Sequence, residues 1–249
     1  MTPQELQDRL LYRDGLMLII DKPAGLPVHA GPGGGPNLER HLDALRFGLP
    51  SPPALAHRLD RDTSGCLVLG RHRKALRRLG ALFAAGAVEK VYWAVVAGIP
   101  AAASGRIELP LRKVTRKGGG WRMIVDRDAG QTAATDYRIL GTDGTSAWLE
   151  LRPRTGRTHQ IRVHCAAGLG CPVLGDPIYG SGIAAGGAAA PLHLHARSIA
   201  VPLYPNRPPV TAEASPPPHM RAALARCGFT EEAFAAAATA GVTTAAPLR

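Results

Sequence analysis

The segment HRLDRDTSG, from His57 to Gly65, concentrates charges in a way that could do chemistry on a substrate. Arg58 and Arg61 bracket Asp60 in it. A carboxylate beside guanidinium groups stays ionised because the positive charges favour its charged form, so Asp60 could serve as a nucleophile or a base. The apolar sequences ALAHRL and CLVLGR flank the segment. They predict that these charges lie at one edge of a core, and a solvated polar hairpin is the alternative.

Asp60 and Asp62 also permit a second hypothesis, a metal site. Residues two apart on an extended segment face the same side, so the two carboxylates could hold Mg²⁺ for phosphoryl transfer. The neighbouring arginines would repel a divalent cation, and we therefore expect no metal. A Mg²⁺-dependent phosphoryl-transfer enzyme stays open as an alternative function.

A second concentration of charge is the segment RPRTGRTHQIRVHC, residues 152–165. Its arginines are Arg152, Arg154, Arg157 and Arg162. Thr158 is a candidate N-cap for a helix through HQIRVHCAAG, and Arg162, four residues later, would share its helix face. Helix N-termini attract phosphate, and nearby arginines strengthen this attraction. His159 and His164 are five residues apart and do not share a helix face. We therefore expect histidines that are hydrogen-bonded within the protein or that face RNA, and no zinc site.

The segment EKVYWAVV, from Glu89 to Val96, has the composition of a strand. On a strand, Tyr92 and Trp93 point to opposite faces. A single tyrosine on a strand usually packs against neighbours, so the residues alone favour a packing role for Tyr92 over a catalytic one.

The elements that must position these segments are mostly strands. Further strands are predicted over 15–22, 105–109, 121–125, 132–140, 147–151 and 192–201, and helices over 38–47, capped by Asn37, and over 74–85. Because the strands outnumber the helices and are mostly consecutive, the sequence predicts an α+β domain with a largely antiparallel sheet. Residues 181–190 predict a Gly/Ala-rich loop. We expect a catalytic domain over 1–214 and a Pro/Ala-rich tail with two helices over 215–249.

Composition limits the partners. The 249 residues include 30 Lys and Arg against 19 Asp and Glu, a net charge of +11, which favours a polyanion such as nucleic acid or an anionic membrane surface. The hydrophobic fraction of 45% excludes wholesale disorder. The four cysteines have no C-x-x-C spacing and predict reduced thiols. No secretory signal and no apolar run of about 18 residues is present, so we expect a cytoplasmic protein without a membrane partner.

Taken together, these segments resemble the RluA family of RNA pseudouridine synthases. HRLDRDTSG matches the family's HRLDxxTSG motif, whose aspartate is essential for catalysis. EKVYWAVV is similar to the second motif, with Tyr92 at the active-site tyrosine, and RTGRTHQIRVH matches the third, with Arg162 at the arginine that pairs with the aspartate. DKPAGLPVH, LGDPIYG and LHLHARSI are further matches in the family's order, and the resemblance runs from about Leu11 to Pro202.

The resemblance implies a pseudouridine synthase fold, a curved and mostly antiparallel mixed sheet with flanking helices and a central active-site cleft. It implies isomerisation of uridine in structured RNA, either rRNA or tRNA, without cofactor or metal, and we expect a monomer. The implied catalytic residues are Asp60, Tyr92 and Arg162, and the expected RNA contacts are Arg58, Arg61, Arg157 and His159. The match begins near the start of the sequence, so no N-terminal S4 RNA-binding domain is expected. A catalytically silent RNA-binding protein is the second alternative, and the intact catalytic set argues against it.

Overall fold

The computed structural model describes residues 1–31, 34–115, 119–180 and 190–230. Ten strands of this part form one sheet: β1 (Leu10–Arg13), β2 (Met17–Lys22), β3 (Ala54–Leu55), β4 (Ser64–Gly70), β5 (Glu89–Ala97), β6 (Ser104–Glu108), β9 (Ala134–Thr142), β10 (Ser146–Pro153), β11 (Leu194–Val201) and β12 (Val210–Glu213). The order across the sheet is β1, β2, β4, β11, β5, β10, β9, β6, with β3 on β4 and β12 on β11. Only β4 and β11 pair in parallel. The predicted α+β class with a mostly antiparallel sheet is confirmed.

Few helices accompany the sheet in the described residues. They are α1 (Pro3–Gln7), the 3₁₀-helix η1 (Leu38–Leu45), α2 (Arg73–Ala84), α3 (Gln160–Val163), the π-helical turn η2 (His164–Gly168) and α4 (Pro218–Arg226). The helix predicted over 38–47 is therefore a tighter 3₁₀-helix. The side chain of Asn37 does not cap it, because its amide donates to the carbonyl of Gly35 instead. The leucines of η1 are buried as their spacing predicts.

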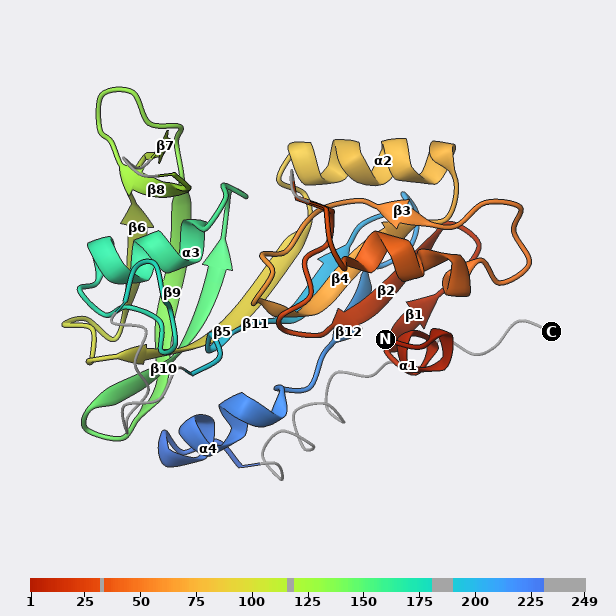
Figure 1. The fold of residues 1–249 in the computed structure, drawn as a ribbon. Coiled ribbons are helices and arrows are strands. Elements are labelled where there is room, and N and C mark those ends of the chain that lie inside the picture. Colours follow the sequence, from red (N-terminus) through yellow and green to blue (C-terminus); the bar gives the residue numbers. More distant parts are fainter. Residues whose placement is uncertain (32–33, 116–118, 181–189, 231–249) are drawn as a thin grey trace.

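The first half of the sheet is covered on both faces. Side chains alternate along β2, so Leu18 and Ile20 pack with the leucines of η1, whereas Met17 and Ile19 pack with Leu79 of α2. Every residue of β4 is buried, which explains why its sequence is a continuous apolar run without alternation. Figure 1 shows α2 and η1 over this half, and α3 beside β9 and β10 in the other half.

The second half has its own two clusters. Ala94 and Val96 of β5 pack with β10 and α3 on one face, and Val95 packs with Met220 and Leu224 of α4 on the other. The helix α4 is the first of the two predicted after residue 215. The second lies outside the described residues, as do residues 181–189 of the predicted loop over 181–190. The division into domains at residue 214 stays a prediction.

The two halves join where β4 and β11 run in parallel. Gly65 pairs there with Ala196, and its φ of +105° lies in the region that favours glycine. A Cβ at this position would lie 2.2 Å from the carbonyl oxygen of Ala196. Only glycine permits this close approach, which places the segment before β4 directly against β11.

A separate two-stranded ribbon is formed by β7 (Leu111–Thr115) and β8 (Trp121–Val125). The strand over 121–125 was predicted, whereas β1, β7, β12 and α1 were not. These missed elements are short, with five residues or fewer. None of the described helices is long and apolar enough to cross a membrane.

Candidate active site

Asp60 lies on the loop between β3 and β4, and buried contacts fix the shape of this loop. Its carbonyl accepts a hydrogen bond from the backbone N–H of Thr63, at 3.2 Å. The next residue, Ser64, is 2.8 Å from Nδ1 of His195 on β11. Because Nε2 of His195 lies 3.0 Å from the carbonyl oxygen of Ala214, Nε2 is the donor and Nδ1 accepts from the serine hydroxyl. Burial lowers the pKa of His195 to about 4, so this anchor stays neutral.

Lys22, at the end of β2, also holds the loop that carries Asp60. Its side chain is fully buried, and its ammonium donates to the carbonyls of Pro23, Leu26 and Arg61 at 2.7, 2.8 and 3.0 Å. Burial lowers the pKa of Lys22 to about 8, while the carboxylates of Asp62 and Asp60 oppose the shift. Lys22 therefore ties the loop that carries Asp60 to the end of the neighbouring strand.

We expect Lys22→Met to lower the free energy of unfolding by about 2 to 4 kcal/mol at neutral pH, because buried carbonyls lose their donor. The folded wild type releases the Lys22 proton near pH 8, whereas the unfolded chain keeps it to about 10.5. The unfolded state then binds more protons between these values, so this group's contribution to stability rises with pH. Urea unfolding should show the wild-type advantage growing over that window. The exposed Lys74→Met is the control, and an advantage that shrinks from pH 8 to 10 would contradict the prediction.

Two nitrogen-bearing side chains face the carboxylate of Asp60, whose side chain is 19% exposed. Nη1 of Arg162 lies 3.6 Å from its Oδ2, and Nε2 of His159 lies 3.9 Å from the same oxygen. The structure thus brings Asp60 together with His159 and Arg162, which follow it by about a hundred positions in the sequence. The carboxylate is held at the surface of a cavity with positive or hydrogen-donating groups on one side.

The principal partner of Arg162 is not Asp60 but Asp176. Nε and Nη2 of Arg162 donate to the two oxygens of Asp176, each at 2.7 Å. Burial alone would raise the pKa of Asp176, but the hydrogen bonds and charge of Arg162, with the N–H groups of Ile178 and Tyr179, lower it below the ordinary value. Asp176 therefore fixes the guanidinium, whose remaining Nη1 faces Asp60. The expected pairing with Asp60 is the longer and weaker of the two contacts.

His159 is held by its own hydrogen-bond chain. Nδ1 of His159 is 2.9 Å from the hydroxyl of Tyr179, and this hydroxyl accepts from the N–H of Met123 in β8 at 2.9 Å. The hydroxyl of Tyr179 can therefore donate its own hydrogen to Nδ1 of His159. The proton of the neutral imidazole is then on Nε2, which faces Asp60. Burial lowers the pKa of His159 although Asp60 opposes this. The ring of Trp121, also on β8, lies against His159 with centroids 4.9 Å apart.

The prediction that Thr158 caps the helix is wrong. The helix α3 begins at Gln160, and His159 is its N-cap, with a left-handed φ of 52°. The side chain of Gln160 holds the preceding turn, since its Oε1 accepts from the N–H of Arg157 and the hydroxyl of Thr155. The left-handed backbone turns the His159 side chain away from a capping position and toward Asp60.

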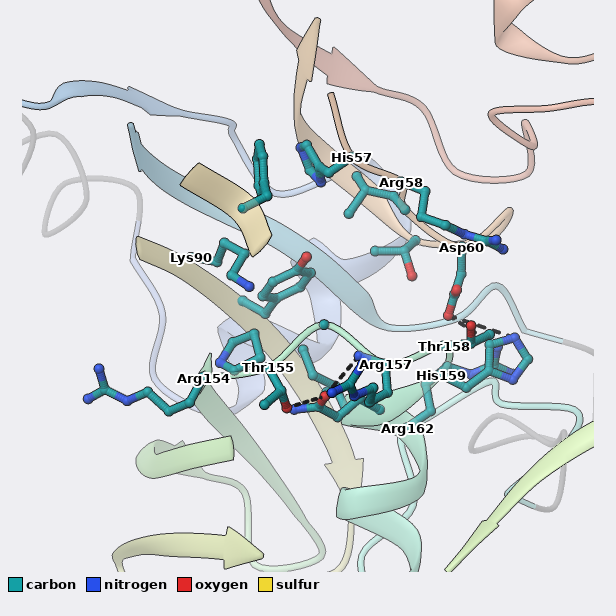
Figure 2. A pocket seen from close by; sticks show the side chains of 18 of the residues that line it. His57, Arg58, Asp60, Lys90, Arg154, Thr155, Arg157, Thr158, His159 and Arg162 are labelled. Carbon is teal, nitrogen blue, oxygen red and sulfur yellow. Dashed lines mark hydrogen bonds and ion pairs between the residues drawn. The ribbon is translucent and has the colours of Figure 1, made fainter. Parts of the chain in front are cut away.

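Tyr92 lies on β5 and packs against the clusters on the cavity face, whereas Trp93 packs on the opposite face. Burial, and secondarily the charge of Asp60, raises the pKa of Tyr92, so its phenol stays protonated at neutral pH. The aromatic ring and the carboxylate line one cavity of about 450 Å³. Figure 2 shows Asp60, His159 and Arg162 converging at one side of this cavity.

The cavity collects six of the seven predicted site residues, namely Asp60, Tyr92, Arg162, Arg58, Arg157 and His159. The seventh, Arg61, is not among its lining residues. Its side chain is 65% exposed and pairs with Asp62 at 2.9 Å. Asp60 and Asp62 are therefore directed to different partners, and the described residues contain no group of three His, Cys, Asp or Glu side chains placed to hold a metal ion. The geometry does not favour the paired-carboxylate site.

Sequence reasoning missed the supports of the site. Asp176 and Tyr179 come from LGDPIYG and Lys22 from DKPAG, two segments that were noticed only as further matches. The signal in the sequence is a charged residue, such as Lys22, next to a run of apolar residues. A buried charge needs a partner, but the sequence alone does not say which residue that partner is.

Comparison with known proteins shows the family of the chain. The family model described as RNA pseudouridylate synthase matches residues 16–167. An uncharacterized RNA pseudouridine synthase of Zymomonas mobilis is 46% identical over 212 residues, which cover 85% of this chain and 95% of that protein. The chain belongs to the RNA pseudouridine synthase family. The mitochondrial pseudouridylate synthase RPUSD4 of Xenopus tropicalis is 33% identical over 89% of this chain and 81% of its own length.

Solved structures agree with this family. The structure of human RNA pseudouridylate synthase domain containing 4 superposes with a TM-score of 0.74 at 29% identity, over 90% of this chain and 95% of that one. The human domain containing 1 shares the fold, with a TM-score of 0.71 at 24% identity. The chain is thus an RNA pseudouridine synthase, an isomerase that acts on RNA, as the resemblance of its motifs predicted.

Proposed function

We propose that Asp60 is the catalytic carboxylate of this pseudouridine synthase. The observation that supports it is the convergence of Asp60, Tyr92 and Arg162 in one cavity. The reaction breaks the bond between N1 of uracil and C1′ of ribose, turns the base and joins C5 to C1′, while the C5 proton leaves and N1 gains one. The composition of the nucleoside does not change, so the reaction needs no oxidant, reductant or group donor, and we expect neither a cofactor nor a metal.

The cavity suggests roles for the neighbours of Asp60. The target uridine must leave the RNA stack to reach the carboxylate. Tyr92, protonated and half-buried, offers an aromatic face for the base. Arg162, fixed by Asp176, keeps a positive charge 3.6 Å from the carboxylate of Asp60. Arg58 and Arg157 are exposed at the cavity, where they would hold flanking phosphates or fill the vacated stack.

The proposed substrate is a structured RNA, rRNA or tRNA, modified by a cytoplasmic monomer. The test is a map of pseudouridines in total RNA from a strain that lacks the gene, against its parent strain. The expected result is the loss of pseudouridine at one or a few uridines and its return with the wild-type gene. Unchanged maps in rRNA and tRNA would contradict the proposed substrate. Purified protein should release tritium from [5-³H]uridine RNA equally well with and without EDTA.

We expect RNA affinity to fall steeply with salt. Each neutralised phosphate contributes about −0.7 to −0.9 to the slope of log K against log salt, so a slope beyond about −3 is expected for several contacts. Arg77 and Arg78 are exposed on α2, whose end lines the cavity. Charge reversal of both should reduce the slope without changing which uridine is modified. Binding titrations at increasing KCl measure the slope. An unchanged slope would mean that these arginines lie on a solvent-exposed helix face and do not contact RNA.

A further inference from the structure

The cavity has a second polar end that catalysis as proposed does not use. Lys90 lies on β5 two residues before Tyr92, so the two side chains share one face of the strand, and both line the cavity. Figure 2 places Lys90 and Arg154 on the side of the cavity away from Asp60 and His159. Phe83, at the end of α2, also lines the cavity and stacks on His57 with ring centroids 4.4 Å apart.

Lys90 is a half-buried cation with no counter-ion among the residues that the structure describes. Within the described part of the chain, its ammonium makes no ion pair and no side-chain hydrogen bond, and burial lowers its pKa with no carboxylate to offset the shift. The neighbouring His57 is neutral, because burial and the charge of Lys90 lower its pKa to about 3. Arg154 is already paired with Asp136 at 2.7 Å. This end of the cavity therefore carries an unbalanced positive charge.

A partly desolvated charge is costly unless a partner balances it, and the substrate of this enzyme is a polyanion. We propose that Lys90 binds a phosphate of the RNA substrate at this end of the cavity and so holds the strand next to the target uridine. The inference rests on the RNA-modifying function given above, and it adds a substrate contact that neither the catalytic set nor the exposed arginines supply.

Two other partners for Lys90 fit the geometry less well. A uracil carbonyl could accept a hydrogen bond, but it is neutral and would leave the charge unbalanced. Asp60 is the cavity's carboxylate, yet its close contacts are Arg162 and His159 on the far side. A phosphodiester carries a full negative charge, which would balance the positive charge of Lys90. An ammonium group binds phosphate well as a point charge.

The test is a coupling measurement between Lys90 and single phosphates. The probe is an RNA stem-loop that carries the uridine found by mapping, with an uncharged methylphosphonate in place of one phosphodiester at a time near that uridine. Binding is measured with protein that also carries Asp60→Asn, so that turnover does not change the probe. One linkage should weaken binding about tenfold when neutralised, and Lys90→Met should weaken binding of unmodified RNA by a similar factor. Both changes together should cost no more than either alone.

Matched variants separate this role from others. Lys90→Arg keeps the charge and should keep the loss at that linkage, whereas the exposed Lys74→Met should show no coupling to it. If Lys90→Met lowers the melting temperature, the same binding measurements are made with Lys90→Gln, whose side chain keeps a polar end. Additive losses at every linkage, or a Lys90 variant with reduced turnover and unchanged affinity, would overturn the phosphate contact. Tritium release by the wild type is measured in parallel, and its absence would instead refute the proposed function.

Discussion

Asp60→Asn should abolish pseudouridine formation, by at least about a thousandfold in turnover, while RNA binding survives. The amide keeps the size and polarity of the side chain but has no charge with which to attack or to take a proton. The loop should keep its shape, because its anchors are Lys22, Thr63 and Ser64 and not the Asp60 carboxylate. Binding should hold or tighten, since the change removes a negative charge from a cavity that receives a polyanion.

Asp62→Asn is the matched control for this experiment. It removes a carboxylate two residues away that pairs with Arg61 outside the cavity, so its tritium release should stay within a few-fold of wild type. Equal losses in both variants would instead favour joint action of the two carboxylates, as in the Mg²⁺ hypothesis. Wild-type release by Asp60→Asn would remove Asp60 from the mechanism.

Arg162→Met should damage both activity and stability, and the structure explains why the two effects occur together. Arg162 and Asp176 are 4% and 0% exposed, so loss of the arginine leaves a buried carboxylate without its partner. Breaking such a pair costs about 3 to 5 kcal/mol. Burial would then raise the pKa of Asp176 above its ordinary 3.8, so the variant should become less stable as pH rises through that range. Urea unfolding at pH 5 and pH 7.5 should show a smaller deficit at the lower pH.

A double variant separates the two effects. Arg162→Met with Asp176→Asn removes both charges but keeps an oxygen that accepts from the N–H groups of Ile178 and Tyr179. It should recover most of the lost stability, because no unpaired charge is left buried. Its activity should stay low if the positive charge beside Asp60 serves the reaction. Recovery of activity along with stability would reduce Arg162 to a structural residue.

The sequence predicted the strands well because their apolar runs are long and bounded by Gly, Pro or Asp. The strand over Glu89–Ala97 and the helix α2 are found within one residue of the prediction. The start of α3 was misplaced because Gln160, the first residue of the helix, takes the place of a Thr158 cap by accepting hydrogen bonds from Arg157 and Thr155. Local propensity contains no information on such a contact.

For the site, the motifs predicted which residues meet but not how each is held. The proximity of Asp60 and Arg162 followed from the resemblance, whereas the bidentate contact of Arg162 with Asp176 is a tertiary fact. The separation of Asp62 from Asp60 likewise depends on the turn at Thr63, which an extended-chain argument ignores. Buried charges such as Lys22 and Asp176 were visible in the sequence, and their partners were visible only in the fold.

The parallel contact of β4 with β11 sets the order in which the enzyme can assemble. Ser64 meets His195 across 131 positions of the chain, and synthesis at about 5–20 residues per second takes roughly 7 to 26 seconds to cover that interval. During this time the buried strand β4 has no β11 beside it, and an unpaired apolar edge invites association with other chains. The segment that holds Asp60 thus leaves the ribosome well before the strand that locks it in place, so nascent chains halted before β11 should be aggregation-prone and inactive.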